Sequence, residues 1–327
     1  MLVMLTNLSK YHAAGQWEKV LKHCDYLQQI LDITSDDEMG LHKNRLPILA
    51  IFIYAYKEGI ASDNILRGRH ALTLCHLLSH CIVSHIKLND NEAVGRSMCD
   101  MASFAQIVPA EQLPPGRDPI PIEFHFNGAL QLGRTRGISS VVAQACLGLG
   151  QLSLESGEMD AAERLFKEAF VAASKVKHEH ETHACLLLAD LYFVKGKVEK
   201  ADWFVQRTSC LLQEDQYGLY KLFTPMHLAN QLQKIRIHEA KGETPHVAVG
   251  LGKFVKLVHL NVVDVAKWKL MLQIIILHSF GHLRTLDKSN GDPFLKKMMT
   301  NLADCCGISP EDVYLPPHRK LPRIKYV

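Results

Sequence analysis

Two stretches of the chain share one pattern of small and apolar residues and decide the fold: Ala143 to Ser174, AQACLGLGQLSLESGEMDAAERLFKEAFVAAS, and Thr182 to Gln213, THACLLLADLYFVKGKVEKADWFVQRTSCLLQ. At an offset of 39 residues, five positions match: Cys146 with Cys185, Leu149 with Leu188, Gly150 with Ala189, Gly157 with Gly196, and Ala162 with Ala201. Each stretch predicts a helical hairpin, because the glycine ends one helix and the small residues let the next approach closely. We expect Phe166 and Val205 to fill the space between successive hairpins.

The rest of the chain shows the same helical periodicity. Apolar residues recur every three or four positions from Leu2 to about Cys306, and no convincing strand alternation interrupts them. This pattern predicts roughly fourteen helices joined by short turns. We therefore expect an all-α fold, an α-solenoid of about seven antiparallel helical hairpins.

The repeated positions resemble the tetratricopeptide repeat. In the first stretch the match comprises Gly150, Gly157, Ala162, Phe166 and Ala169. The second stretch matches at Ala189, Tyr192, Gly196 and Ala201 but departs at Val205 and Thr208, and looser units surround Tyr11, Gly15 and Trp17, and Gly242. The glycine spacings, 39 and then 46 residues, exceed the 34 of a standard repeat, which indicates longer helices. The resemblance implies a superhelix with a concave groove that takes peptides or partner helices.

Proline clusters suggest where the array is interrupted. Five of the 13 prolines lie between residues 109 and 121, and four lie in the last eighteen residues. Since proline blocks helix interiors, we expect an N-terminal hairpin array over 1–108, a loop or linker over 109–121, a repeat array over 122–308 and a basic tail over 309–327. The 109–121 segment either separates two arrays or lengthens one turn.

Composition excludes several classes of protein. The chain is 47% hydrophobic and 22% charged, and 37 basic against 34 acidic residues leave a net charge of +3, too small to indicate nucleic-acid binding. The longest apolar runs are about eleven residues, shorter than the ~20 that a membrane span needs, and the first ten residues make a poor secretory signal. The nine cysteines, unlike a secreted framework, are interpreted as reduced, buried thiols. We expect a cytoplasmic protein, with the nucleus as an alternative.

Two histidine-rich segments resemble metal-binding motifs only in part. The segment KHEHETH, from Lys177 to His183, lacks a second histidine four residues after His178, because Thr182 stands there. We interpret it as the turn between two hairpins. On a second segment His76 and His80 share a helix face, whereas Cys81 points elsewhere, so the cluster Cys75, His76, His80, Cys81 and His85 is interpreted as interface histidines and buried thiols.

Other catalytic patterns fail as well. VGLGKF lacks the glycine and the hydroxyl residue of a phosphate loop, LGLGQL lacks the third glycine of a dinucleotide site, and no Gly-x-Ser-x-Gly is present. The segment GRTRG is interpreted as a helix end with cations near the carbonyl terminus. No catalytic residue, metal or cofactor is predicted, so we expect a protein that is not an enzyme.

The hypothesis for function is an interaction scaffold or complex subunit. We expect the first helices of the two hairpins to line the groove that binds a protein or peptide, through Gln144, Leu147, Gln151, Leu154, His183, Leu186, Asp190 and Phe193. These residues do not supply the lysine, arginine and asparagine with which chaperone-binding repeats capture a carboxylate, so that role is not expected.

Two rival functions and one further surface remain. The first rival is a ligand- or peptide-responsive regulator of a partner domain, and the second is a metal-dependent enzyme using the histidine-rich turns. The tail carries four cations, interpreted as a solvated terminus or alternatively as a docking peptide for an acidic protein or nucleic acid: Arg319, Lys320, Arg323 and Lys325.

Overall fold

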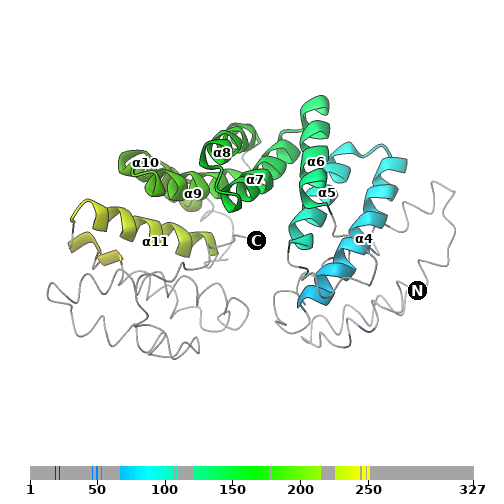
Figure 1. The fold of residues 1–327 in the computed structure, drawn as a ribbon, viewed down its shortest axis with the longest axis horizontal. Helices are drawn as coiled ribbons and strands as arrows, with labels where there is room; N and C mark the ends of the chain where they lie inside the picture. The colour runs from blue at the N-terminus through cyan, green and yellow to red at the C-terminus, as the bar shows by residue number, and fades with distance from the viewer. Residues whose placement is uncertain are drawn as a thin grey trace. The chain divides into compact units, whose positions relative to one another are not determined.

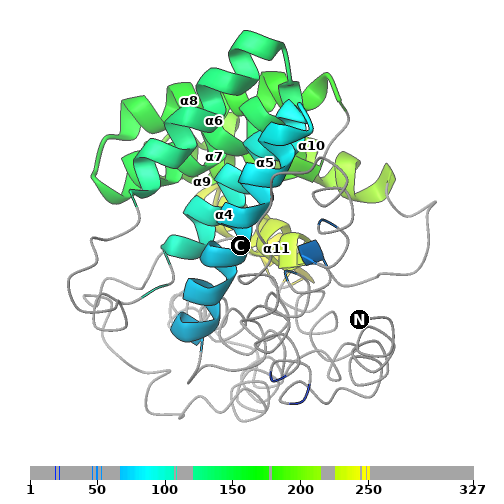
Figure 2. The ribbon, with the colours of Figure 1, turned by 90° about the vertical axis from the view of Figure 1, so that its right-hand side faces the viewer.

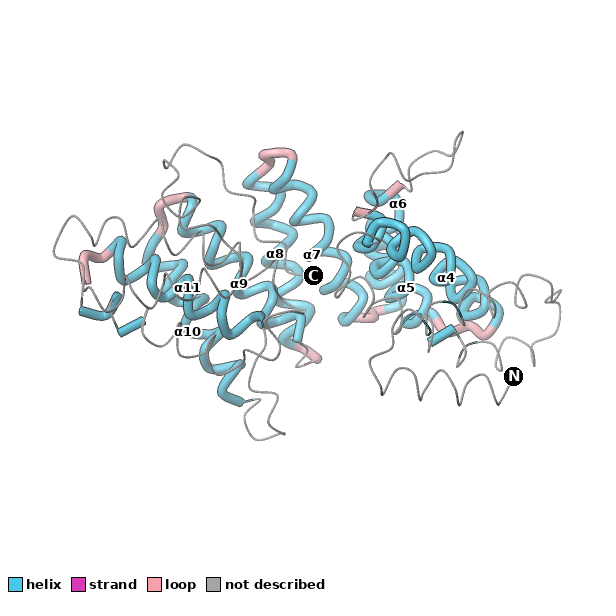
Figure 3. Tube along the Cα trace, turned by 90° about the horizontal axis from the view of Figure 1, so that it is seen from below, coloured by secondary structure: helices cyan, strands magenta, loops and turns pink. Residues whose placement is uncertain are grey.

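The computed structural model describes residues 67–106, 108, 121–176, 179–214, 225–243, 245–247 and 249–250, with the single positions 19, 22, 46, 49, 50 and 53. Every element in this part is a helix, and none is a strand (Figure 3); eight helices have defined bounds. They are α4 (Arg67–Lys87), α5 (Asn91–Ala105), α6 (Ile122–Arg136), α7 (Ser139–Glu155), α8 (Met159–Ser174), α9 (Glu179–Val194), α10 (Val198–Glu214) and α11 (Pro225–Ala240) (Figure 1). The all-α prediction is confirmed for these residues, and the total of about seven hairpins stays a prediction.

The chain forms two compact units, residues 1–176 and 177–327, which are described separately. The division falls inside the array predicted for residues 122–308. Of the proline-rich segment 109–121, only Pro121 is described, yet the helices on either side of it, α5 and α6, pack against each other within unit 1. Within this unit the segment therefore connects two neighbouring helices.

Unit 1 is built from helices that pack against their neighbours in chain order. Contacts run from α4 to α5, α6, α7 and α8 in turn, and α5 also packs against α7. Figure 1 shows α7 between α6 and α8, and Figure 2 shows the same helices turned by 90° about the vertical axis. This pattern, in which alternate helices also touch, is that of stacked antiparallel hairpins α5–α6 and α7–α8.

In unit 2, too, the described helices pack against their neighbours in chain order. Helix α9 packs against α10, α10 against α11, and α11 returns to contact α9. Helix α9, the first helix of its hairpin, therefore lies beside α11, as α5 lies beside α7 in unit 1. Helices α5, α7, α9 and α11 are called first-type helices below, and α6, α8 and α10 are called second-type helices.

The repeated positions hold equivalent places in the two hairpins. Cys146 and Cys185 are fully buried, as are Ala162 and Ala201. Gly157 and Gly196, at φ of +84° and +70°, both adopt the left-handed conformation that glycine favours at a helix end. The two predicted hairpins are confirmed.

One expectation about the repeat is wrong. A Cβ atom built on Gly150 would come within 2.4 Å of the Phe166 ring, which is fully buried. Phe166 therefore fills the contact between α7 and α8 within one hairpin rather than the space between hairpins. Two residues earlier, Gly148 lies against Phe126 of α6 in the same way. The two glycines allow an aromatic ring to approach α7 from both neighbouring helices.

Helix α6 ends as the segment GRTRG predicts. Its last residue is Arg136, and Gly137 follows at φ +69° with its N–H bonded to the carbonyl of Gly133. Arg134 and Arg136 lie in the last turn, where cations complement the partial negative charge of the carbonyl end. Arg134 also forms two hydrogen bonds with Glu168 of α8, which ties the two second-type helices together.

Across the described residues, no helix combines the length and the apolar character that a membrane crossing requires. The loose repeat around Tyr11, Gly15 and Trp17 lies outside the described residues. The looser unit around Gly242 is predicted to end its first helix there, and α11 ends at Ala240, two residues before that glycine.

Candidate functional site

The predicted groove residues of α7 include two polar side chains on an otherwise buried stretch. Between residues 140 and 151 of α7, every residue is buried except Gln144 and Gln151. The two are seven residues apart and so lie on one face of the helix. Gln144 reaches α5, where its Nε2 donates a hydrogen bond to Asp100 Oδ1 at 2.8 Å. Asp100, Gln144 and Gln151 are called the unit 1 stripe below.

Helix α9 has the same arrangement. Between residues 181 and 193, the residues that are not buried are His183, Asp190 and Phe193. Arg236 of α11 contacts the last two, because its Nη1 bonds Asp190 Oδ1 at 2.6 Å and its guanidinium lies 4.3 Å from the centre of the Phe193 ring. His183, Asp190, Phe193 and Arg236 are called the unit 2 stripe.

Two predicted groove residues are not exposed. Leu147 is 4% exposed and Leu186 is fully buried, so the expectation that they line an open groove is wrong. Leu186 is covered because α11 packs on α9, where Gln233 Nε2 donates to the Leu186 carbonyl oxygen at 3.0 Å. Leu147 is covered because α5, α6 and α8 all pack against α7. Leu154, the remaining member, is half-buried.

The histidine-rich segment is the start of a helix rather than a turn. Helix α9 begins at Glu179, so His180, Glu181 and His183 are helical, while His178 lies outside the described residues. Burial lowers the pKa of His183 to about 4, so its ring is neutral at neutral pH. Glu181, 3% exposed, accepts two hydrogen bonds from Arg207 of α10, at 3.0 and 2.6 Å. This part of the segment therefore holds α9 and α10 together.

The second histidine and cysteine cluster lies on α4, as predicted. The rings of His76 and His80 share a face, with centroids 4.8 Å apart, whereas Cys75 and Cys81 are buried. His85 lies 3.8 Å from Asp90, and burial lowers its pKa despite that carboxylate. Cys75 Sγ donates to the Met101 carbonyl oxygen of α5 at 3.5 Å, so this thiol takes part in the packing between the two helices.

Four of the described thiols are poor nucleophiles because they are buried. Burial raises the pKa values of Cys75, Cys146 and Cys185 to about 12 and raises that of Cys99 as well. A buried thiol stays protonated at neutral pH and lacks the reactivity of a thiolate. Cys210, on α10, is the exposed cysteine among those described.

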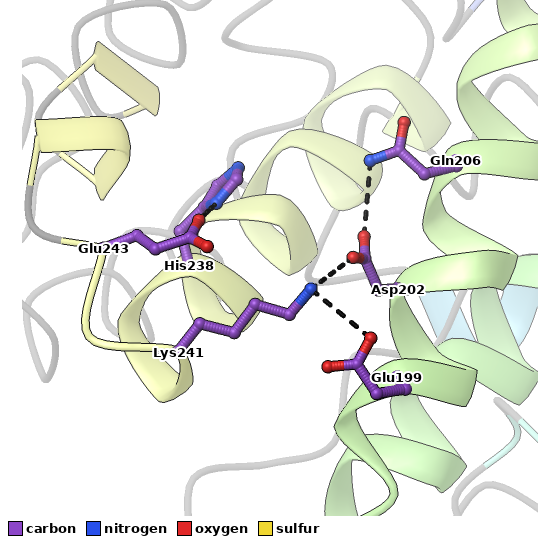
Figure 4. A network of polar contacts seen from close by, with 6 residues as sticks. All are labelled: Glu199, Asp202, Gln206, His238, Lys241 and Glu243. Atoms are coloured by element: carbon purple, nitrogen blue, oxygen red, sulfur yellow. Dashed lines mark hydrogen bonds and ion pairs between the residues drawn. The ribbon is translucent and has the colours of Figure 1, made fainter.

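A polar cluster that the sequence reasoning missed lies at the end of α11 (Figure 4). His238 Nδ1 lies 2.6 Å from Glu243 Oε2, and the His238 ring stacks on His246 with centroids 5.1 Å apart. Within the described residues, His238, Glu243 and His246 are the three side chains of metal-ligating type whose donor atoms lie within 4.8 Å of one another. The spacing, a histidine, a glutamate five residues later and a histidine three after that, was the available signal.

The same end of α11 is tied to α10 through Lys241. Its Nζ lies 2.5 Å from Asp202 and 3.7 Å from Glu199. Hydrogen bonding to Asp202 raises the pKa of Lys241. The pKa of Asp202 falls, because hydrogen bonds from Lys241 and Gln206 outweigh the opposing effect of its burial. The lysine therefore keeps its charge and holds two carboxylates beside the cluster.

The tail residues Arg319, Lys320, Arg323 and Lys325 lie outside the described residues. Their predicted docking role stays a prediction.

Comparison with protein-family models gives no match, and comparison with curated proteins gives none either. The arrangement of side chains therefore carries the functional argument.

Proposed function

We propose that this chain is a non-enzymatic interaction scaffold of tetratricopeptide-like hairpins, which binds a peptide or a partner helix along the stripe of a first-type helix. One observation carries the proposal: partly accessible side chains recur at seven-residue spacing on helices that are otherwise buried. They are Gln144 and Gln151 on α7, and His183 and Asp190 on α9. Helical-repeat proteins present such aligned first helices to their partners.

The chemistry of the unit 2 stripe suits a peptide better than a small metabolite. The Asp190 side chain is 44% exposed although Arg236 bonds it, so its carboxylate retains lone pairs for backbone N–H groups of a bound chain. Phe193 offers an apolar surface at the end of the same stripe. A partner segment with alternating polar and apolar contacts satisfies both groups.

The unit 1 stripe is less charged. Gln144 is bonded to Asp100, and Gln151 one helical repeat further on is half-buried. A side-chain amide supplies both a donor and an acceptor, which matches a peptide backbone in either direction. We therefore expect the unit 1 stripe to bind a partner segment more weakly than the unit 2 stripe does, and without a preference for the direction of the bound chain.

The proposal is tested by isolating the partner with the full-length chain and then measuring its affinity for purified variants. Phe193→Ala should weaken binding by about 30-fold, the effect of losing an aromatic hot spot. Trp203→Ala is the matched control, because Trp203 is 55% exposed on α10 and outside the stripe.

A second pair of variants tests unit 1. Gln151→Arg should reduce the affinity, whereas Gln131→Arg makes the same chemical change at an exposed position of α6 and should not. If the purified partner binds all four variants as tightly as the wild-type chain, the assignment of the binding surface is wrong.

A further inference from the structure

Two histidines and one glutamate converge where α11 ends. His238 lies in the last turn of the helix, Glu243 follows the turn, and His246 lies three residues further on. One donor atom from each side chain lies within 4.8 Å of the other two. His238 and Glu243 are partly exposed and His246 is exposed, so the donors are accessible to an ion from solvent.

The backbone brings these donors together. Gly242, at φ +72°, reverses the chain, and the Glu243 N–H bonds the His238 carbonyl oxygen at 2.9 Å. This is the hydrogen bond that closes a helix with a left-handed glycine. The His246 N–H then bonds the Glu243 carbonyl oxygen at 2.9 Å, which fixes the third donor relative to the second. The set is therefore held by main-chain geometry as well as by side-chain contacts.

The surrounding charges favour a cation. The carbonyl end of α11 carries partial negative charge, and Glu243 adds a full one. Lys241 is the nearby cation, and Figure 4 shows its ammonium directed towards Asp202 and Glu199 of α10, away from the His238 ring. Two carboxylates therefore neutralise the lysine, and Glu243 remains as the charge that faces the histidines.

We propose that His238, Glu243 and His246 bind one Zn²⁺ ion. Two imidazoles and one carboxylate form a ligand set that zinc accepts, with water in the fourth position. Because the three donor atoms lie within 4.8 Å of one another, an ion placed among them can lie no more than about 2.8 Å from each, and small side-chain rotations bring it to the usual 2.0–2.2 Å.

The third donor distinguishes this site from a helix cap. The hydrogen bond between His238 and Glu243 closes the end of α11 without any contribution from His246. His246 nevertheless stacks on the His238 ring, with an interplanar angle of 22°. Zinc then joins the end of α11 to the chain that follows it and stabilises unit 2 there.

The test uses the full-length chain, freed of metal with a chelator and titrated with Zn²⁺ against a chromophoric competitor. The wild-type chain should bind one equivalent at this site, and Co²⁺ in its place should give the visible absorption of a tetrahedral complex. His246→Gln and Glu243→Gln should each weaken the binding by at least about 100-fold, since even the loss of a group that only supports a ligand costs 10- to 100-fold.

His76→Gln is the matched control, because His76 is an exposed histidine that lies next to a second one on α4. It should leave the affinity unchanged, and circular dichroism checks that every variant is folded. The proposal is overturned if the wild-type chain binds no stoichiometric zinc, if the folded His246→Gln and Glu243→Gln variants bind as tightly as the wild type, or if His76→Gln weakens binding equally.

Discussion

The ring of Phe166 lies directly against the backbone of Gly150: a Cβ atom on Gly150 would come within 2.4 Å of Phe166 Cε1. Phe166 is fully buried, so other parts of the protein surround its ring. This contact sets the separation of α7 and α8.

Gly150→Ala should destabilise the protein by up to about 2 kcal/mol, because overpacking costs about 1–3 kcal/mol and the better helix propensity of alanine offsets about 1 kcal/mol of that cost. Gly128→Ala is the matched control: its Cβ would meet only the flexible end of Met98, at 2.6 Å. That variant should be neutral or more stable by up to about 1 kcal/mol. Equal free energies of unfolding for the two variants, measured with denaturant, would contradict the packing account.

The turn glycines should respond alike in both hairpins. Nothing lies within 4 Å of a Cβ atom on Gly157 or Gly196, so any cost of alanine there comes from the positive φ alone. Each Gly→Ala variant should lose about 1–2 kcal/mol, and each Gly→Asn variant should lose less. Thermal unfolding compares the four. A loss confined to one hairpin would show that the two turns are not equivalent.

Two arginine–glutamate pairs differ in burial and should therefore contribute differently to the free energy of unfolding. The Glu181 side chain is 4% exposed beside Arg207, whereas Arg134 and Glu168 are 55% and 37% exposed. Arg207→Met leaves a buried carboxylate without its partner and should cost about 2–3 kcal/mol, below the range for fully buried pairs because Arg207 is 39% exposed. Arg134→Met should cost about 0–1 kcal/mol. Denaturant unfolding measures both losses of free energy. A loss for Arg134→Met as large as that for Arg207→Met would contradict the argument from burial.

The free energy of unfolding should depend on pH through His183. The pKa of His183 is about 4 in the folded chain against the ordinary 6.5. Between these two pH values the imidazole is protonated in the unfolded state and neutral in the folded state. Stability from this group is complete above pH 6.5 and falls by about 1–3 kcal/mol as the pH is lowered towards 4.

His183→Gln should flatten that part of the profile, whereas His76→Gln, at an exposed position, should leave it in place. Unfolding measured at intervals from pH 7 to pH 4 compares the three proteins. An unchanged slope in His183→Gln would show that another group carries the acid sensitivity.

The sequence was sufficient for the hairpins because their signals are local. Gly157 and Gly196 mark the turns, and the small residues Ala162 and Ala201 mark where helices approach, so one alignment predicts both. Phe166 was misplaced because periodicity says that a residue is buried but not which neighbour it touches. Only the glycine at position 150, directly under the ring, decides that.

The candidate sites were harder to predict because they depend on helices far along the chain. Leu186 repeats Leu147 in the alignment, yet its burial depends on α11, whose residue Gln233 is 47 positions away. The cluster of His238, Glu243 and His246 is close in sequence, but it straddles a helix end, so a pattern restricted to one helix face misses it.

The central claim, that the stripe of a first-type helix binds a partner protein, is tested most directly by photo-crosslinking in cells. A photoreactive residue is placed at Gln151 of α7 in one version of the chain and at Gln131 of α6 in another. The account predicts a crosslink from position 151 to one defined segment of a second protein and none from position 131. No crosslink from position 151, or the same products from both positions, would contradict it.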